Sequence, residues 1–161
     1  NPPLTASGYE RARELAARLE GSGIEMIIAT DDLRTQQTAA PIATKLGLLP
    51  VIFDPADAAG IREYIDRHYR GRGVLVVGHP DTIPDLVGEL GDGVAAGTGF
   101  ESGYDNLYIV VRGSRSDAGA VRTRYGEFDE GGEKVGSLAG GSLPQAQITS
   151  RGTADSKKML R

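Results

Sequence analysis

The stretch that most constrains the fold of this chain is Gly73–Pro80, which reads Gly-Val-Leu-Val-Val-Gly-His-Pro. Four consecutive apolar residues, three of them valine, end abruptly at Gly78 and His79. A short β-branched run without polar alternation is typical of a strand buried on both faces, and such strands belong to parallel sheets covered by helices. Gly78 is expected to let the backbone turn sharply. His79 then lies at the carboxyl end of the strand, where open α/β sheets bind ligands.

The rest of the pattern alternates between helices and strands, which predicts an α/β fold of three layers: a mostly parallel sheet with helices on both faces. At 161 residues the chain suits one domain. Helices are expected from Thr5 to just before Gly21, over 33–46, over 58–69 and from Asp81 to Leu90. Strands are expected over 24–30, 51–53, 74–77 and 107–111, with a short edge strand over 121–125.

From residue 127 onward this periodicity fails, and glycine, serine and charged residues follow without a repeating pattern. We therefore expect an α/β domain over 1–126 and a disordered tail over 127–161.

Composition excludes several classes of partner and site. The net charge of -4 gives no reason to expect nucleic acid or an anionic membrane surface. Cysteine is absent, so disulfides and thiolate metal sites are excluded. No run reaches the length of a membrane span. The chain begins at Asn1-Pro2-Pro3 without a signal peptide, so a cytoplasmic location is preferred, while export stays open if a signal lies upstream.

Two cationic side chains are expected to meet at one edge of the sheet. Arg34 stands at a helix start just after the strand 24–30, and His79 ends the strand 74–77. An arginine fork beside an imidazole, near free N–H groups of helix N-termini, forms a natural phosphate pocket. The other interpretation, that Gly78-His79 has only a structural use at a strand end, stays open on spacing alone. The second histidine, His68, lies among arginines at a helix end and is expected at the surface.

Four segments resemble the histidine phosphatase superfamily, whose fold is phosphoglycerate mutase-like, and they occur in that family's order and spacing. Leu4-Thr5-Ala6-Ser7-Gly8 is similar to its first helix start, and 30–39 (Thr-Asp-Asp-Leu-Arg-Thr-Gln-Gln-Thr-Ala) to its "SxxxRxxQTA" segment. Val74–His79 resembles its late strand ending in Gly-His, and Tyr104–Tyr108 the edge strand that often follows. The resemblance covers about residues 3–126.

The resemblance implies catalysis through phosphohistidine. In the family, a histidine of an Arg-His-Gly or similar triplet attacks the phosphoryl group, two arginines and a second histidine surround it, and water cleaves the phosphoenzyme. Arg34 matches the second arginine and His79 the second histidine. No such triplet occurs in the chain, so the first central strand and its nucleophile are expected just upstream of Asn1. A carboxylic acid usually protonates the leaving group, and Asp54 and Asp57 are the candidates. A turn role for Asp54 and a helix cap for Asp57 are the simpler interpretations.

The function expected from this resemblance is hydrolysis of a phosphomonoester or a phosphoprotein, without metal or other cofactor, because a cationic pocket would neutralise the charge. The short segment between Phe53 and Gly73 leaves little room for a cap over the site, which favours a small broad-specificity phosphatase or one acting on phosphoprotein over a mutase. The alternative is a non-catalytic remnant that binds phosphorylated ligands or a partner protein. The sequence leaves the substrate and the oligomeric state open.

Overall fold

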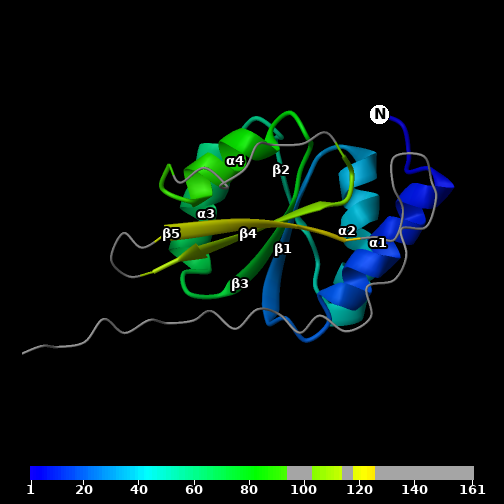
Figure 1. Ribbon diagram of the computed structural model, residues 1–161, viewed down its shortest axis with the longest axis horizontal. Helices are drawn as coiled ribbons and strands as arrows, with labels where there is room; N and C mark the ends of the chain where they lie inside the picture. Colours follow the sequence, from blue (N-terminus) through cyan, green and yellow to red (C-terminus); the bar gives the residue numbers. More distant parts are fainter. Residues whose placement is uncertain (94–102, 114–117, 126–161) are drawn as a thin grey trace, which may run out of the picture.

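The structure, a computed structural model, describes residues 1–93, 103–113 and 118–125 (Figure 1). Four helices and five strands follow one another along the described chain: α1 (Ala6–Arg18), β1 (Ile24–Thr30), α2 (Leu33–Leu46), β2 (Val51–Phe53), α3 (Ala58–His68), β3 (Gly73–Val77), α4 (Ile83–Leu90), β4 (Asn106–Arg112) and β5 (Ala118–Arg124). The tail expected over 127–161 lies outside the described residues.

The central layer is a parallel sheet in the order β2-β1-β3. Helices α1 and α2 lie on one side of it, and α3 and α4 lie on the other (Figure 1). This arrangement confirms the predicted α/β architecture of three layers, with helices on both faces of a parallel sheet.

Strand β1 holds the two faces together because its side chains alternate between two hydrophobic clusters. Ile27 and Ala29 pack with α1 and α2, in a cluster that includes Ala16, Ile42 and Leu75. On the other face, Met26 and Ile28 pack with residues of α3 and α4, among them Ile61, Ile65 and Leu86. The last five residues of β1 are all buried, as a central strand covered on both faces requires.

The ends of the helices follow local capping chemistry. Thr5 accepts a hydrogen bond from the N–H of Gly8 and so caps α1. Gly47 ends α2 in the left-handed conformation, with φ of 67°, which a glycine adopts without strain. Asp57 caps α3 by accepting from the N–H of Gly60. These signals explain why the predicted bounds of the first three helices agree with the structure to within one or two residues.

Strands β4 and β5 form a separate antiparallel sheet and do not join the parallel one. Neither hydrophobic cluster includes a residue of this hairpin. Two arginines tie it to the helices instead. Arg112 of β4 makes a bidentate ion pair with Asp66 of α3, and Arg18 of α1 donates to the backbone carbonyl of Arg124 in β5 at 3.1 Å.

A cavity of about 330 Å³ opens between β3, β4 and α1. Within the described residues, β3 pairs with β1 along one edge only, and β4 pairs only with β5. Their other edges border the cavity, whose walls include Leu75 to His79 and Asn106 to Tyr108. The walls are mostly apolar, and α1 adds Ala12 and Leu15.

The expectation for Gly78 is wrong. Its φ is not positive, and an added Cβ would meet Ile83 at 3.4 Å, an ordinary contact distance. The chain turns after it, where the carbonyl of His79 accepts from the N–H groups of Thr82 and Ile83. None of the described helices is long and apolar enough to cross a membrane.

Candidate functional site

His79 lies at the carboxyl edge of the parallel sheet, beside the tip of β1. The register pairs Ala29 of β1 with Val77 of β3, so the residues that follow, Thr30 and Gly78, lie side by side. His79 comes one position later and is only 5% exposed. A buried imidazole needs partners for both ring nitrogens, and the neighbouring segment supplies them.

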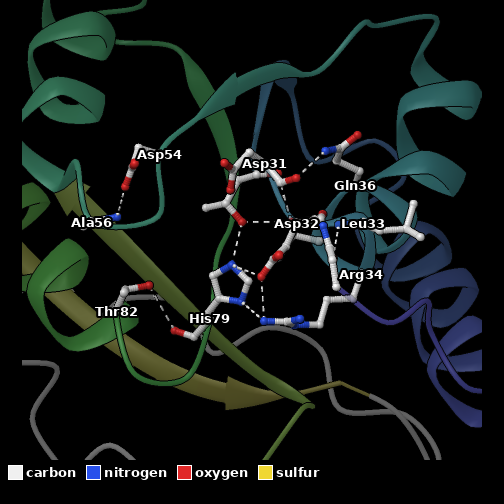
Figure 2. Close-up of polar contacts among 12 residues, drawn as sticks. Asp31, Asp32, Leu33, Arg34, Gln36, Asp54, Ala56, His79 and Thr82 are labelled. Carbon is white, nitrogen blue, oxygen red and sulfur yellow. Dashed lines mark hydrogen bonds and ion pairs between the residues drawn. The ribbon is translucent and has the colours of Figure 1, made fainter.

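Arg34 is the second residue of α2, and the short link Asp31-Asp32 brings it back over the tips of the strands. Its Nη2 lies 3.2 Å from Nδ1 of His79 (Figure 2). The arginine side chain keeps 39% of its surface exposed, so its guanidinium is accessible at the edge of the cavity. The structure therefore brings the two sequence-predicted phosphate-binding residues into direct contact.

This contact indicates the tautomer of the imidazole. A guanidinium has only donors, so Nδ1 of His79 must accept the hydrogen bond from Arg34. The proton of the neutral ring is then on Nε2.

Behind the ring, two threonines complete a hydrogen-bonded chain. Nε2 of His79 lies 2.8 Å from Oγ1 of Thr30, which lies 2.8 Å from Oγ1 of Thr35. Because Nε2 donates, the hydroxyl of Thr30 accepts from it and donates to Thr35. The hydroxyl of Thr35 in turn donates to the carbonyl of Asp32 at 2.8 Å. Both threonines are buried, so the chain holds the ring in one orientation.

The carboxylate of Asp32 lies against both Arg34 and His79. Its Oδ2 is 2.6 Å from Nη2 of Arg34 and 3.4 Å from Nε2 of His79 (Figure 2). Asp32 occupies the N-cap position of α2 but makes no capping hydrogen bond. Its side chain turns toward Arg34 and His79 instead.

Asp54 and Asp57, the two candidate proton donors, have local structural contacts. The Oδ1 atom of Asp54 accepts from the N–H of Ala56 in its own turn (Figure 2), and Asp57 is the cap of α3. Within the described residues, neither carboxylate contacts Arg34 or His79. His68 is exposed at the end of α3, with its ring 4.8 Å from that of Tyr64. The structure thus keeps these three residues apart from the Arg34–His79 pair.

Sequence reasoning missed three members of the site: Thr30, Asp32 and Thr35. A signal for them was present. Thr30 is the last residue of β1, and His79 follows the end of β3. Neighbouring parallel strands bring their carboxyl ends together. Asp32 is two residues before Arg34, within reach of its guanidinium. In the described part of the chain, no three His, Cys, Asp or Glu side chains gather as a metal site would require.

Two comparisons of sequence bear on this site. Residues 1–56, about a third of the chain, match the family model of the histidine phosphatase superfamily (branch 1). A probable phosphoglycerate mutase, GpmB from Enterobacter sp. (strain 638), is 42% identical over 83 residues, which are 52% of this chain and 34% of that protein. The N-terminal third of this chain is therefore similar to the histidine phosphatase superfamily. The chain spans about a third of the length of that curated relative.

Solved structures agree in fold. The protein histidine phosphatase SixA, complexed with tungstate, is similar with a TM-score of 0.61 and 22% identity, over 76% of this chain and 83% of that one. A structure named mycobacterial hydrolase 2 is similar with a TM-score of 0.56 and 15% identity, over 74% of this chain and 78% of that one. At these identities the likeness shows the fold of this chain and does not extend to its substrate.

Proposed function

We propose that this chain carries the phosphate-binding half of a histidine-type phosphatase, which hydrolyses a phosphomonoester or a phosphoprotein through a phosphohistidine. The observation that carries the proposal is the contact between Arg34 and His79 at the edge of the cavity. Arg34 would grip two phosphoryl oxygens with its fork, and His79 would stabilise the transferring group by donating from Nε2 to a phosphoryl oxygen in place of Thr30. The similarity of residues 1–56 to the histidine phosphatase superfamily supports this assignment.

In the proposed reaction, a histidine nitrogen attacks phosphorus and the bond to the ester oxygen breaks. The leaving oxygen takes a proton from an acid, and water then attacks the phosphohistidine, which releases inorganic phosphate and restores the ring. The described residues provide the binding groups for both steps. We place the nucleophile on a segment upstream of Asn1 that would enter the cavity between β3 and β4.

The cavity supports this placement of the nucleophile. Its walls include residues of β3 and of β4, two strands that do not pair with each other within the described residues, and its lining is mostly apolar. An extended apolar segment between them would pair its backbone with both edges. The end of such a segment could reach the neighbourhood of His79, because His79 lines the same cavity.

The experiment is an assay of the protein with its upstream residues, using p-nitrophenyl phosphate and a phosphohistidine peptide. Hydrolysis with a trapped phosphohistidine upstream of Asn1 would establish the proposal. The alternative, a non-catalytic remnant, predicts binding of inorganic phosphate with no turnover. A protein that neither binds phosphate nor hydrolyses these esters would contradict both.

The same proposal includes two further expectations: the reaction needs no metal, and the partner is a phosphorylated small molecule or a phosphoprotein. Activity that persists after treatment with a chelator, and no gain on adding Mg²⁺, are the expected results. The preference for a hydrolase over a mutase is tested by supplying a phosphorylated acceptor: water should receive the phosphoryl group.

A further inference from the structure

We propose that Asp32 is a built-in competitor for the phosphate position, so that a phosphoryl oxyanion binds only by displacing its carboxylate. This inference rests on the proposed function, because it names the residue that sets the anion affinity of the same site. Asp32 touches both groups assigned to the phosphate: Nη2 of Arg34 at 2.6 Å and Nε2 of His79 at 3.4 Å. A phosphate oxygen placed between those two atoms would occupy the space of Oδ2.

The charges show why displacement is necessary. Arg34 contributes one positive charge and Asp32 contributes one negative charge. This ion pair therefore carries no net charge while Asp32 is in place. A phosphate dianion that approached it would meet an already neutralised guanidinium and a carboxylate at van der Waals distance, which is repulsive.

The structure also supplies a place for Asp32 to go. An aspartate at the N-cap normally accepts a hydrogen bond from the N–H of the second or third helical residue. Asp32 makes no such bond. In the described part of the chain, the N–H groups of Arg34 and Thr35 have no acceptor, while that of Leu33 donates to Asn1. A rotation of the Asp32 side chain would cap α2 and release Arg34 to the incoming phosphate.

Asp32 thus has two alternative sets of partners, the Arg34–His79 pair or the N-terminus of α2. Its side chain is 26% exposed, so rotation does not require the core to open. Phosphate binding shifts the carboxylate of Asp32 from the Arg34–His79 pair to the N-terminus of α2. The more strongly Asp32 binds that pair, the lower the affinity of the site for phosphate.

The test measures binding of inorganic phosphate to the 161-residue chain by isothermal titration calorimetry at pH 7. Asp32→Asn keeps the shape of the side chain and removes its charge. Asp31→Asn is the matched control, because Asp31 is adjacent, equally charged and exposed. We expect Asp32→Asn to bind phosphate on the order of tenfold more tightly than the parent, and Asp31→Asn to stay within about twofold, since exposed charges are screened.

Equal or weaker phosphate binding by Asp32→Asn, with measurable binding by the parent, would overturn the inference and leave the proposed function standing. Absence of binding in all three proteins would remove the proposed function and the inference with it. Asp32→Ser, which keeps a capping hydroxyl without charge, should also bind more tightly and guards against a folding defect in Asp32→Asn. In the parent, phosphate should slow hydrogen exchange at the amides of Arg34 and Thr35; no such change would contradict the rotation of Asp32.

Discussion

Arg34 and His79 are 45 residues apart in sequence, yet Nη2 of the arginine donates to Nδ1 of the histidine at 3.2 Å. Two elements make this contact: β3 ends at Val77, just before the histidine, and α2 begins one residue before the arginine. Because both strands preceding these residues run in the same direction, their carboxyl ends meet at one edge of the sheet.

Arg34→Ala should abolish most of the affinity for inorganic phosphate or vanadate, because it removes a charge-assisted bidentate partner. We expect a loss of at least tenfold, measured by titration calorimetry. Arg67→Ala is the control, since Arg67 pairs with Glu63 on the exposed face of α3. Equal vanadate binding by Arg34→Ala and the parent would rule out Arg34 as the phosphate clamp.

The tautomer of His79 can be read directly by long-range ¹H–¹⁵N NMR. The neutral ring should carry its proton on Nε2, with Nδ1 unprotonated, because Nδ1 accepts from Arg34. The sequence has two histidines, so the imidazole signals that remain in His68→Ala belong to His79. The variant should leave phosphate binding unchanged. A neutral His79 protonated on Nδ1 would show that the contact with Arg34 does not exist in solution.

Thr30→Val should destabilise the chain by about 1–2 kcal/mol, because the methyl group can neither accept from His79 nor donate to Thr35 in a buried place. Urea unfolding provides the measurement. Thr44→Val on the exposed face of α2 should stay within about 0.5 kcal/mol of the parent. If both variants unfold alike, the hydroxyl chain contributes nothing to stability.

Asp66 should make the stability of the chain fall in acid. Its hydrogen bonds to Arg112, and then to Arg62, lower the pKa of the carboxyl from 3.8 to about 2. A depressed pKa in the folded state stabilises the fold above the unfolded pKa, and that contribution disappears as the pH falls from about 4 to 2. The side chain is 24% exposed, so we expect a contribution of about 1–2 kcal/mol.

Asp66→Asn tests this pH dependence. Between pH 7 and pH 2, the parent should lose about 1–2 kcal/mol more free energy of unfolding than the variant does, because other carboxylates titrate alike in both. Urea unfolding at several pH values gives the comparison. Parallel curves for the two proteins would show that Asp66 titrates equally in the folded and unfolded states.

Local chemistry made much of this fold predictable from the sequence. The bounds of β1 and α2 follow from three local signals: the apolar run 24–30, the acidic pair Asp31-Asp32 before the helix, and Gly47 at its end. The meeting of Arg34 and His79 was predictable because parallel strands share an edge. The contacts of Asp32 could not be predicted, because an N-cap aspartate normally accepts a hydrogen bond from its own helix. Its choice of partners depends on the orientation of its side chain, which the spacing of residues in the sequence does not determine.

The separation of the two sheets was equally beyond the sequence pattern. The apolar run 107–111 predicts a strand, and 121–125 predicts a short edge strand that can pair with it because the two are close in sequence. Whether β4 also pairs with β3 depends on contacts between residues far apart in the sequence, which a local pattern does not specify. Gly78 shows the opposite error: a glycine before a turn suggested a special conformation, while the turn uses the carbonyl of His79 instead.

The arginine anchors of the β4–β5 hairpin have a practical consequence. The hairpin is held on the helices by the ion pair between Asp66 and Arg112 and by the hydrogen bond from Arg18 to the carbonyl of Arg124, and neither hydrophobic cluster includes it. Its attachment to the helices is therefore expected to weaken as the ionic strength rises. The parallel sheet, bound by dispersion and burial, does not share that sensitivity. Salt is therefore expected to weaken the attachment of the cavity wall formed by β4 more than that of the wall formed by β3.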